Sequence, residues 1–272
     1  MSDSRAIGIF DSGLGGLTVA KEIIKRLPNE NIIYFGDTGR VPYGTRSLTT
    51  IRKYAVQDEI FLLKQDVKLI VAACGTVSSV AADTGEALPV PFVEVVSHAV
   101  KAAVTATKNQ KIGVLGTAAT INSGAHKSQI LKLLPSAQVF VSSCTLFVPL
   151  VEEGWYQSDD LVVLETVKRY VRPMIDAGVD TLILGCTHYP VLWDAIRKVM
   201  GANVTLINAG TAAAENIQKH LTENGGLRKE NKKAERRFYV SDKPKSFRRI
   251  ASILLGEDID ERTVEQVDID KL

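Results

Sequence analysis

The chain is poor in cysteine: it has three, Cys74, Cys144 and Cys186, and none of them forms a C-x-x-C pair. An odd and sparse set argues against a disulfide framework. It is typical of a protein that stays in a reducing cytosol, where thiols remain available for chemistry. The N-terminus also lacks the apolar segment of a secretory signal. We therefore expect a cytoplasmic protein with free thiols.

Long apolar runs and an excess of one charge are also missing. Runs such as Leu69–Cys74 are far shorter than the roughly 20 residues that cross a bilayer. The 33 basic and 31 acidic residues leave a net charge of only +2, which predicts neither nucleic acid nor a membrane surface as partner. With 272 residues, 45% of them hydrophobic, the chain can build about two domains. A small-molecule partner is the remaining expectation.

What the chain does contain is an alternation of short apolar runs and amphipathic helical patterns. Leu17, Ala20, Ile24 and Leu27, for example, share one face of a helix. Many of the runs are apolar throughout, as in strands that helices cover on both faces. The predicted strands are 6–10, 31–36, 68–73, 91–96, 111–116, 137–142, 181–185, 203–207 and 236–240. The alternation predicts an α/β fold with mostly parallel sheets flanked by helices.

The chain also repeats itself. Ile7–Ser12 resembles Ile112–Thr117, and Leu69–Cys74 resembles Thr181–Cys186. Each half thus opens with a strand that ends in a small hydroxyl residue, and each later presents a cysteine at a strand end. The repeat indicates two pseudo-symmetric α/β domains.

We place the second domain at 98–207, and the first domain at 1–97 plus 208–272. A strand near 203–207 would carry the chain back to the first domain. If the two domains face each other, their strand ends form one active site at the domain interface, with one thiol on each side.

Ligands of parallel α/β sheets bind outside the carboxyl ends of the strands. The residues at these positions are small, hydroxylated or titratable. They are Asp11-Ser12-Gly13, the segment 37–44, Cys74-Gly75-Thr76, Gly116-Thr117 and Cys186-Thr187-His188. Backbone N–H groups at the following helix starts favour carboxylates. We therefore expect a small substrate with anionic groups.

Cys74 and Cys186 carry the chemical prediction. One cysteine at a strand end is more often a small packed residue than a catalyst, and we interpret Cys144 in that way. Two at matching positions of similar domains favour catalysis. A helix start after each would lower the thiol pKa from about 8.5 toward the working range of acid–base catalysis. Thiols on opposite faces of one carbon suit racemisation, in which one removes a proton and the other returns one.

Asp11 and His188 are the natural assistants. A carboxylate near Cys74 or an imidazole near Cys186 could relay protons or tune a thiol. The remaining histidines are His98, His126 and His220, and the sequence gives none of them such neighbours.

Three blocks resemble the cofactor-independent aspartate/glutamate racemase family, and glutamate racemases in particular. They are Asp11-Ser12-Gly13-Leu14-Gly15-Gly16, Gly36-Asp37-Thr38-Gly39-Arg40-Val41-Pro42-Tyr43-Gly44 and Gly185-Cys186-Thr187-His188-Tyr189-Pro190. They come in the family's order and span most of the chain. The resemblance implies two pseudo-symmetric domains with the site between them. It implies interconversion of L- and D-glutamate for peptidoglycan, with no cofactor and no metal, in an enzyme that is often a homodimer.

The resemblance also implies residue roles. Cys74 would deprotonate D-glutamate and Cys186 would deprotonate L-glutamate. The positions that match substrate-contacting or assisting residues of the family are Asp11, Ser12, Tyr43, Gly44, Thr76, Thr187 and His188, with Thr117 and Glu152 as further residues lining the site. Gly75 is also expected to line the substrate site, although it differs from the residue that the family usually has there.

One residue departs from the family pattern. The family usually has Ala-Cys-Asn-Thr around the first cysteine, where this chain has Ala73-Cys74-Gly75-Thr76. Losing a hydrogen bond to a charged group costs about 1.5–3 kcal/mol. Asn208 also replaces a more usual acidic residue. Two alternatives therefore stay open: a racemase for another acidic amino acid such as aspartate, and a glutamate-binding relative with weakened catalysis.

Two readings from other classes are less well supported. Gly13-x-Gly15 followed by a helix resembles half of a dinucleotide fingerprint, but Thr18 stands where that motif needs Gly or Ala. Cys74, Cys186, His188 and Asp11 could ligate zinc, but their spacing matches no short zinc motif.

Overall fold

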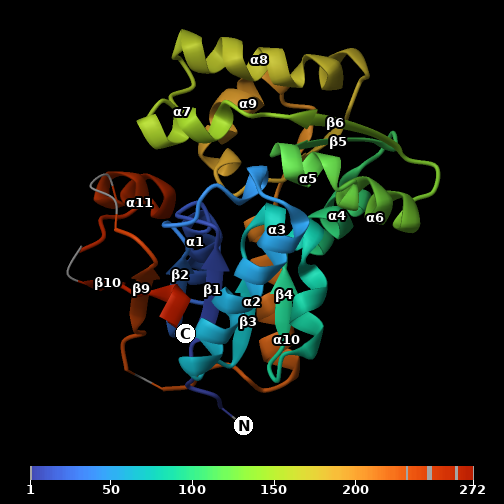
Figure 1. The fold of residues 1–272 in the computed structure, drawn as a ribbon. Coiled ribbons are helices and arrows are strands. Elements are labelled where there is room, and N and C mark those ends of the chain that lie inside the picture. Colours follow the sequence, from blue (N-terminus) through green and yellow to red (C-terminus); the bar gives the residue numbers. More distant parts are fainter. Residues whose placement is uncertain (1, 231, 244–246, 261–262, 272) are drawn as a thin grey trace.

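The computed structural model describes residues 2–230, 232–243, 247–260 and 263–271 (Figure 1). Its strands form two sheets in which every ladder is parallel. The first sheet has the order β10-β9-β2-β1-β3-β4 and the second the order β6-β5-β7-β8. The strands of the first sheet are β1 (Ile7–Asp11), β2 (Ile32–Gly36), β3 (Leu69–Ala72), β4 (Phe92–Glu94), β9 (Arg236–Val240) and β10 (Val264–Gln266). Those of the second are β5 (Lys111–Gly116), β6 (Gln138–Ser143), β7 (Thr181–Leu184) and β8 (Thr205–Asn208).

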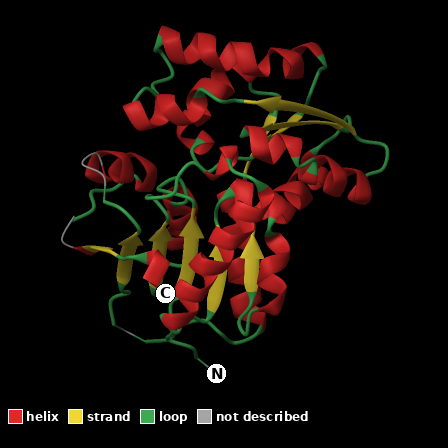
Figure 2. Cartoon of the chain, in the orientation of Figure 1, coloured by secondary structure: helices red, strands yellow, loops and turns green. Residues whose placement is uncertain are grey.

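Helices flank both sheets (Figure 2). They are α1 (Leu17–Arg26), α2 (Leu48–Lys64), α3 (Gly75–Val80), α4 (Val95–Ala106), α5 (Ala118–Asn122), α6 (Ala125–Leu133), α7 (Phe147–Glu153), α8 (Leu161–Asp176), α9 (Trp193–Met200), α10 (Ala209–Glu223) and α11 (Phe247–Leu255). Short 3₁₀ turns include η1 (Tyr43–Thr45), η2 (Ala82–Ala87), η3 (Tyr189–Leu192) and η5 (Ile269–Lys271). None of the helices in the described ranges is both long and apolar enough to span a membrane.

The internal repeat is visible in the strand order. The core of the first sheet runs β2-β1-β3-β4, and the second runs β6-β5-β7-β8, so the same 2-1-3-4 order occurs twice. The strands that carry the repeated sequence, β1 with β5 and β3 with β7, occupy equivalent central places. The predicted α/β class with two pseudo-symmetric, mostly parallel sheets is therefore confirmed.

All nine predicted strands are present, each within two residues of its predicted bounds. The clearest difference is at 91–96, where β4 ends at Glu94. The Glu94 carboxylate accepts hydrogen bonds from the backbone N–H groups of Val96 and Ser97 and so begins α4 two residues early. β10 was not predicted. It is a three-residue edge strand with two exposed side chains, so it carries no apolar pattern.

The two sheets share one apolar core. Ile9 and Val71 of the first sheet belong to the same buried cluster as Leu182 and Leu184 of the second. After β8 the chain returns to the first sheet through α10, which packs on α1 and α4. The strands of the first sheet point toward the second domain (Figure 2), so their carboxyl ends face it. The division at 98–207 stays our proposal, and β5 to β8 fall within it except for the last residue of β8.

Candidate active site

Cys74 follows β3 and stands at the N-cap of α3, where the repeat predicted it. The thiol is buried, and its Sγ donates to Ser12 Oγ at 3.4 Å. Burial, with the neighbouring Asp11 carboxylate, raises the pKa of Cys74 to about 12, against the opposing effect of the Ser12 hydrogen bond. The predicted lowering by the helix start is therefore wrong for this thiol, because desolvation outweighs it. Cys74 is neutral at physiological pH and can act as a proton donor.

Asp11 ends β1 and lies beside Cys74 on the first-domain side of the site. Its Oδ2 accepts a hydrogen bond from the Gly13 N–H at 3.0 Å. Its Oδ1 is buried and has no hydrogen-bond partner among the described residues. Burial raises the pKa of Asp11, while the nearby His188 opposes that rise. The carboxylate thus lies within electrostatic reach of both halves of the site and has one oxygen available to accept a bond from a ligand.

Cys186 follows β7 after one residue and is partly exposed. It does not begin an α-helix, because a turn and η3 separate it from α9. Its positive neighbour is the buried His188 imidazole, which is hydrogen-bonded to the thiol and, through Nε2, to Glu152 Oε1 at 3.0 Å. Burial alone would lower the pKa of His188, but the bonds with Cys186 and Glu152 raise it to about 10. The ring is therefore charged near pH 7 and is hydrogen-bonded to the Cys186 sulfur.

A chain of hydroxyl groups crosses the interface. Thr76 Oγ1 lies 3.2 Å from Thr117 Oγ1, which in turn donates to Thr120 Oγ1 at 3.0 Å. Gly44 packs closely against Thr117, since a Cβ at position 44 would lie 3.3 Å from the Thr117 Cβ. Thr120 is almost completely buried and was missed from the sequence. Its position three residues after Thr117, the N-cap of α5, is the signal that could have found it.

Only the backbone of Tyr43 lies at the site, because its side chain belongs to a separate buried cluster. Its hydroxyl is hydrogen-bonded to Asp37 and lies 3.0 Å from Asp58 Oδ2, in a buried cluster that Arg40 completes with ion pairs to both aspartates. A side chain engaged in this way has no hydroxyl to offer a substrate. The cluster instead anchors the segment that holds Gly44 against Thr117.

The loop after β1 is covered by the other domain. Thr18 Oγ1 donates to the Thr187 carbonyl at 2.6 Å, and a Cβ on Gly15 would overlap Thr187 Oγ1. The Gly13-x-Gly15 segment therefore packs against the Cys186 loop and presents no open face to a pyrophosphate. In the described ranges no three His, Cys, Asp or Glu side chains are grouped as metal ligands.

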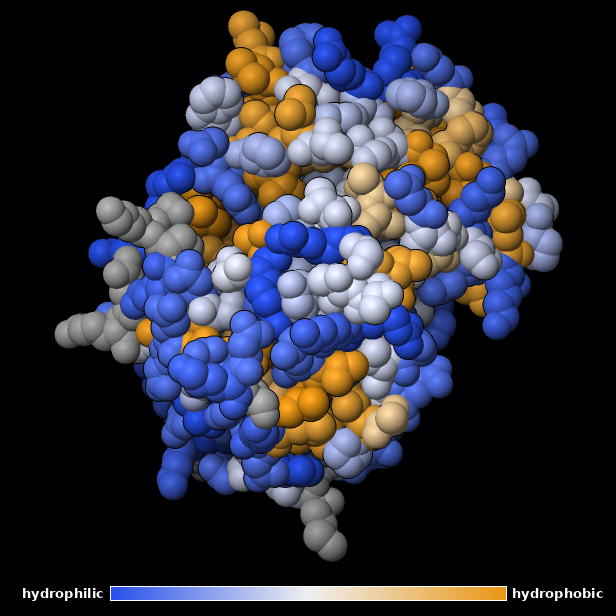
Figure 3. Space-filling model, in the orientation of Figure 1, coloured by the Kyte–Doolittle hydropathy of each residue, from blue (hydrophilic) through white to orange (hydrophobic). Residues whose placement is uncertain are grey.

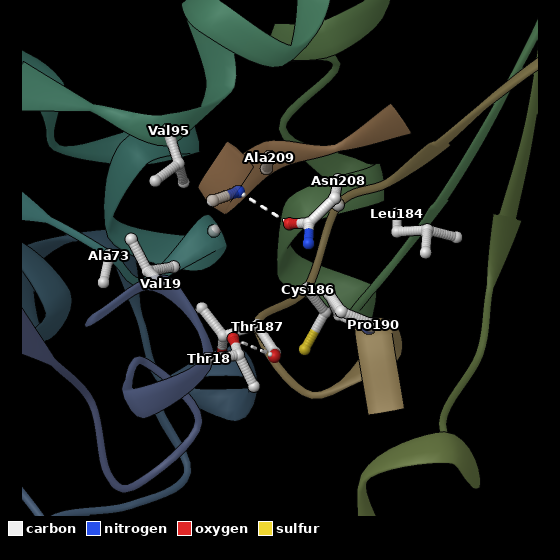
Figure 4. A pocket seen from close by; sticks show the side chains of 13 residues that line it. Thr18, Val19, Ala73, Val95, Leu184, Cys186, Thr187, Pro190, Asn208 and Ala209 are labelled. Atoms are coloured by element: carbon white, nitrogen blue, oxygen red, sulfur yellow. Dashed lines mark hydrogen bonds between the residues drawn. The ribbon is translucent and has the colours of Figure 1, made fainter. Parts of the chain in front are cut away.

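Between the halves lies a cavity of about 10 Å³, lined among others by Thr18, Gly75, Cys186 and Thr187 (Figure 4). This is room for about one water molecule. At its edge Gly75 lies directly against the Gly185 carbonyl, where a Cβ would clash with the backbone. Asn208 Oδ1 accepts the Gly210 N–H at 2.9 Å, so Asn208 serves as the N-cap of α10.

All the residues predicted for the site lie at this interface or in the segments that form it. Cys74, Ser12, Asp11, Gly75, Thr76 and the Tyr43–Gly44 backbone come from the first domain, and Cys186, Thr187, His188, Thr117 and Glu152 from the second. The two thiols thus stand at equivalent strand ends of equivalent sheets, each with its own polar partners.

Known proteins share this architecture. The model of the Asp/Glu/hydantoin racemase family matches residues 10–217. Glutamate racemase from Syntrophus aciditrophicus is 44% identical over 93% of this chain and 93% of its own length. The enzyme from Neisseria meningitidis serogroup A is 44% identical over 97% of this chain and 96% of its own.

Solved structures agree. Glutamate racemase from Francisella tularensis, in complex with D-glutamate, superposes with a TM-score of 0.91 at 40% identity and covers 99% of this chain and 100% of its own. The Thermus thermophilus enzyme, in complex with β-chloro-D-alanine, gives 0.87 at 40% identity, with coverage of 99% and 100%. This extended match in sequence and structure shows that the chain belongs to the Asp/Glu/hydantoin racemase family.

Proposed function

We propose that the protein is a glutamate racemase that interconverts L- and D-glutamate, with Cys74 and Cys186 as its acid–base pair and no cofactor. The observation that carries the proposal is the placement of two thiols at equivalent strand ends of two equivalent sheets. Racemisation needs one group on each face of the reacting carbon. The relatives named glutamate racemase support the choice of substrate.

In the direction from L- to D-glutamate, Cys186 removes the Cα proton as a thiolate and Cys74 donates a proton to the opposite face. The charged His188 ring is hydrogen-bonded to the Cys186 sulfur that takes the proton. The neutral Cys74 thiol, with its pKa of about 12, holds the proton that is delivered. In the reverse direction Cys74 is the base, and it must first lose its proton. The Cα proton is weakly acidic, so surrounding dipoles and exclusion of water must stabilise the carbanionic transition state.

Direct contacts join the two domains around the site, between Thr18 and Thr187 and between Thr76 and Thr117, so we infer that the domains separate to admit the substrate. When the domains close again, the contacts between Thr18 and Thr187 and between Thr76 and Thr117 form again around the bound ligand. A closed site keeps water from the carbanionic centre.

The test is turnover of each enantiomer, followed by circular dichroism, with EDTA present and no pyridoxal phosphate. We expect glutamate to racemise from either side, and Cys74→Ala and Cys186→Ala each to abolish turnover. Cys144→Ala is the matched control, since this third cysteine is a buried core residue. Turnover of aspartate in place of glutamate would contradict the assignment of glutamate as the substrate. Full turnover in either thiol variant would contradict the mechanism.

We also propose that the enzyme works in the cytoplasm, where it supplies D-glutamate for peptidoglycan. The unpaired state of all three cysteines fits a reducing compartment. Depletion of the protein in its host should stop wall synthesis, and added D-glutamate should restore it. Failure of D-glutamate to rescue growth would contradict this role.

For its assembly we propose a homodimer that uses the outer face of α2. Figure 3 shows apolar side chains gathered over this helix, and Val56 and Ile60, one turn apart, are each 40% exposed. Exposed apolar patches often mark protein interfaces. Sedimentation should give a dimer, and V56K combined with I60K should give a monomer. An unchanged dimer in that variant would place the interface elsewhere.

A further inference from the structure

His126 is a buried histidine that the mechanism above does not use. It lies in the first turn of α6, and its side chain is only 3% exposed. Both ring nitrogens are buried, and neither has a hydrogen-bond partner among the described residues. Most buried polar groups in proteins are paired, and an unpaired one costs about 1–3 kcal/mol. A ring with two such atoms therefore calls for a ligand.

The ring lies where the two cysteine loops meet. A Cβ built on Gly185 would lie 3.3 Å from His126 Nε2, so this edge of the imidazole faces the residue before Cys186. The carbonyl of the same Gly185 lies against Gly75, the residue after Cys74. His126 thus lies against the residue before Cys186, and that residue in turn lies against the one after Cys74.

The first domain has no side chain next to the Gly185 carbonyl. The residue there is Gly75, and a Cβ at position 75 would clash with the Gly185 backbone. On the second-domain side, His126 has two buried nitrogens without a partner among the described residues, and one of them faces Gly185. A separation of Gly75 from Gly185 that admits an amino acid would therefore bring the ligand beside Gly185, the residue that His126 contacts.

We propose that His126 is a substrate-binding residue, whose ring N–H donates a hydrogen bond to a carboxylate of the bound amino acid beside Gly75. The proposal rests on the proposed racemase function for the identity of that ligand. Burial lowers the pKa of His126 to about 4, so the ring is neutral at pH 7. A neutral imidazole carries one donor and one acceptor. The donor suits a carboxylate, and the acceptor suits a water or the substrate ammonium group.

A packing role predicts different behaviour. If His126 only fills the core, then His126→Phe keeps the ring shape and removes two unpaired polar atoms. Stability should then rise or stay constant, and catalysis should not change. If His126 binds substrate, the same variant should still fold but should lose affinity.

The test compares His126→Phe and His126→Gln with His98→Phe, a control at a partly buried histidine in α4. We expect His126→Phe to raise KM for D-glutamate at least tenfold, the effect of one lost hydrogen bond to a charged group, with a smaller change in kcat and no loss in Tm. His126→Gln keeps a donor and should recover part of the affinity. An unchanged KM in His126→Phe would overturn the proposal.

A second measurement does not depend on turnover. The ¹⁵N resonances of the His126 ring should shift when D-glutamate is added to the wild-type protein, while those of His98 should not. Absence of a shift at saturating D-glutamate would overturn the proposal even if His126→Phe failed to fold. A wild-type protein that binds glutamate with this shift but does not racemise it would refute the proposed function and leave the role of His126 standing.

Discussion

Replacement of Glu152 by glutamine tests how the Cys186 side of the site is charged. The Glu152 carboxylate lies 3.0 Å from His188 Nε2 and is one of two groups that raise the pKa of this imidazole from 6.5 to about 10. Each pKa unit corresponds to about 1.4 kcal/mol, so the net preference for the charged ring is about 5 kcal/mol, shared between Cys186 and Glu152. A hydrogen bond to a charged group contributes about 1.5–3 kcal/mol. The Glu152 side chain is 40% exposed, and solvent screening reduces its share to about 1–2 kcal/mol.

Glu152→Gln should therefore lower the pKa of His188 by about one unit. Activity that needs the charged ring falls as pH rises through that pKa, so the alkaline limb of the pH–rate profile should move from near 10 to near 9. The assay is kcat/KM for L-glutamate between pH 6 and 10.5, because this ratio reports the pKa values of the free enzyme. Glu153→Gln, an exposed neighbour on α7, is the matched control. The reasoning is refuted if the Glu152→Gln and wild-type profiles coincide.

Three further predictions concern stability. Tyr43→Phe removes the hydroxyl that bridges two buried aspartates and should lower the free energy of unfolding by about 1–3 kcal/mol in chemical denaturation; an unchanged midpoint would contradict the role of the cluster. The raised pKa of His188 means that its stabilising contribution is complete below pH 6.5 and is lost as pH rises toward about 10. The Tm difference between wild type and His188→Gln should therefore shrink between pH 6.5 and 10, and a growing difference would reverse the assigned sign. Arg52→Gln breaks an exposed ion pair with Asp83 and should leave the denaturation midpoint unchanged, because solvent screens surface pairs; a clear downward shift of the midpoint would contradict this.

The sheets could be predicted because their signal is local. Strands such as β3 and β7 are buried at every position, and that burial appears in the sequence as uninterrupted apolar runs. The repeat then gave the equivalence of the two halves. β10 could not be found in this way, because only one of its three side chains is buried.

The site was predictable where residues follow strand ends and unpredictable where tertiary packing decides. His126, for example, comes against Gly185 only in the folded chain, because the two residues are far apart in the sequence. The pKa of Cys74 was predicted in the wrong direction, since the sequence shows a helix start but not the burial that outweighs it. Tyr43 was correctly placed near the site, but its hydroxyl is bound by Asp58, a partner that only the folded chain provides.

The central claim is that two solvent-exchanging thiols act on opposite faces of one carbon. It is tested most directly by racemising D-glutamate in D₂O and measuring Cα deuterium in both enantiomers at early times. We expect the L-glutamate product to carry deuterium delivered by Cys186, while the unconverted D-glutamate keeps its original hydrogen. A product that retains the substrate's own hydrogen, or a substrate that gains deuterium as fast as the product, would point to a single base and contradict the two-thiol account.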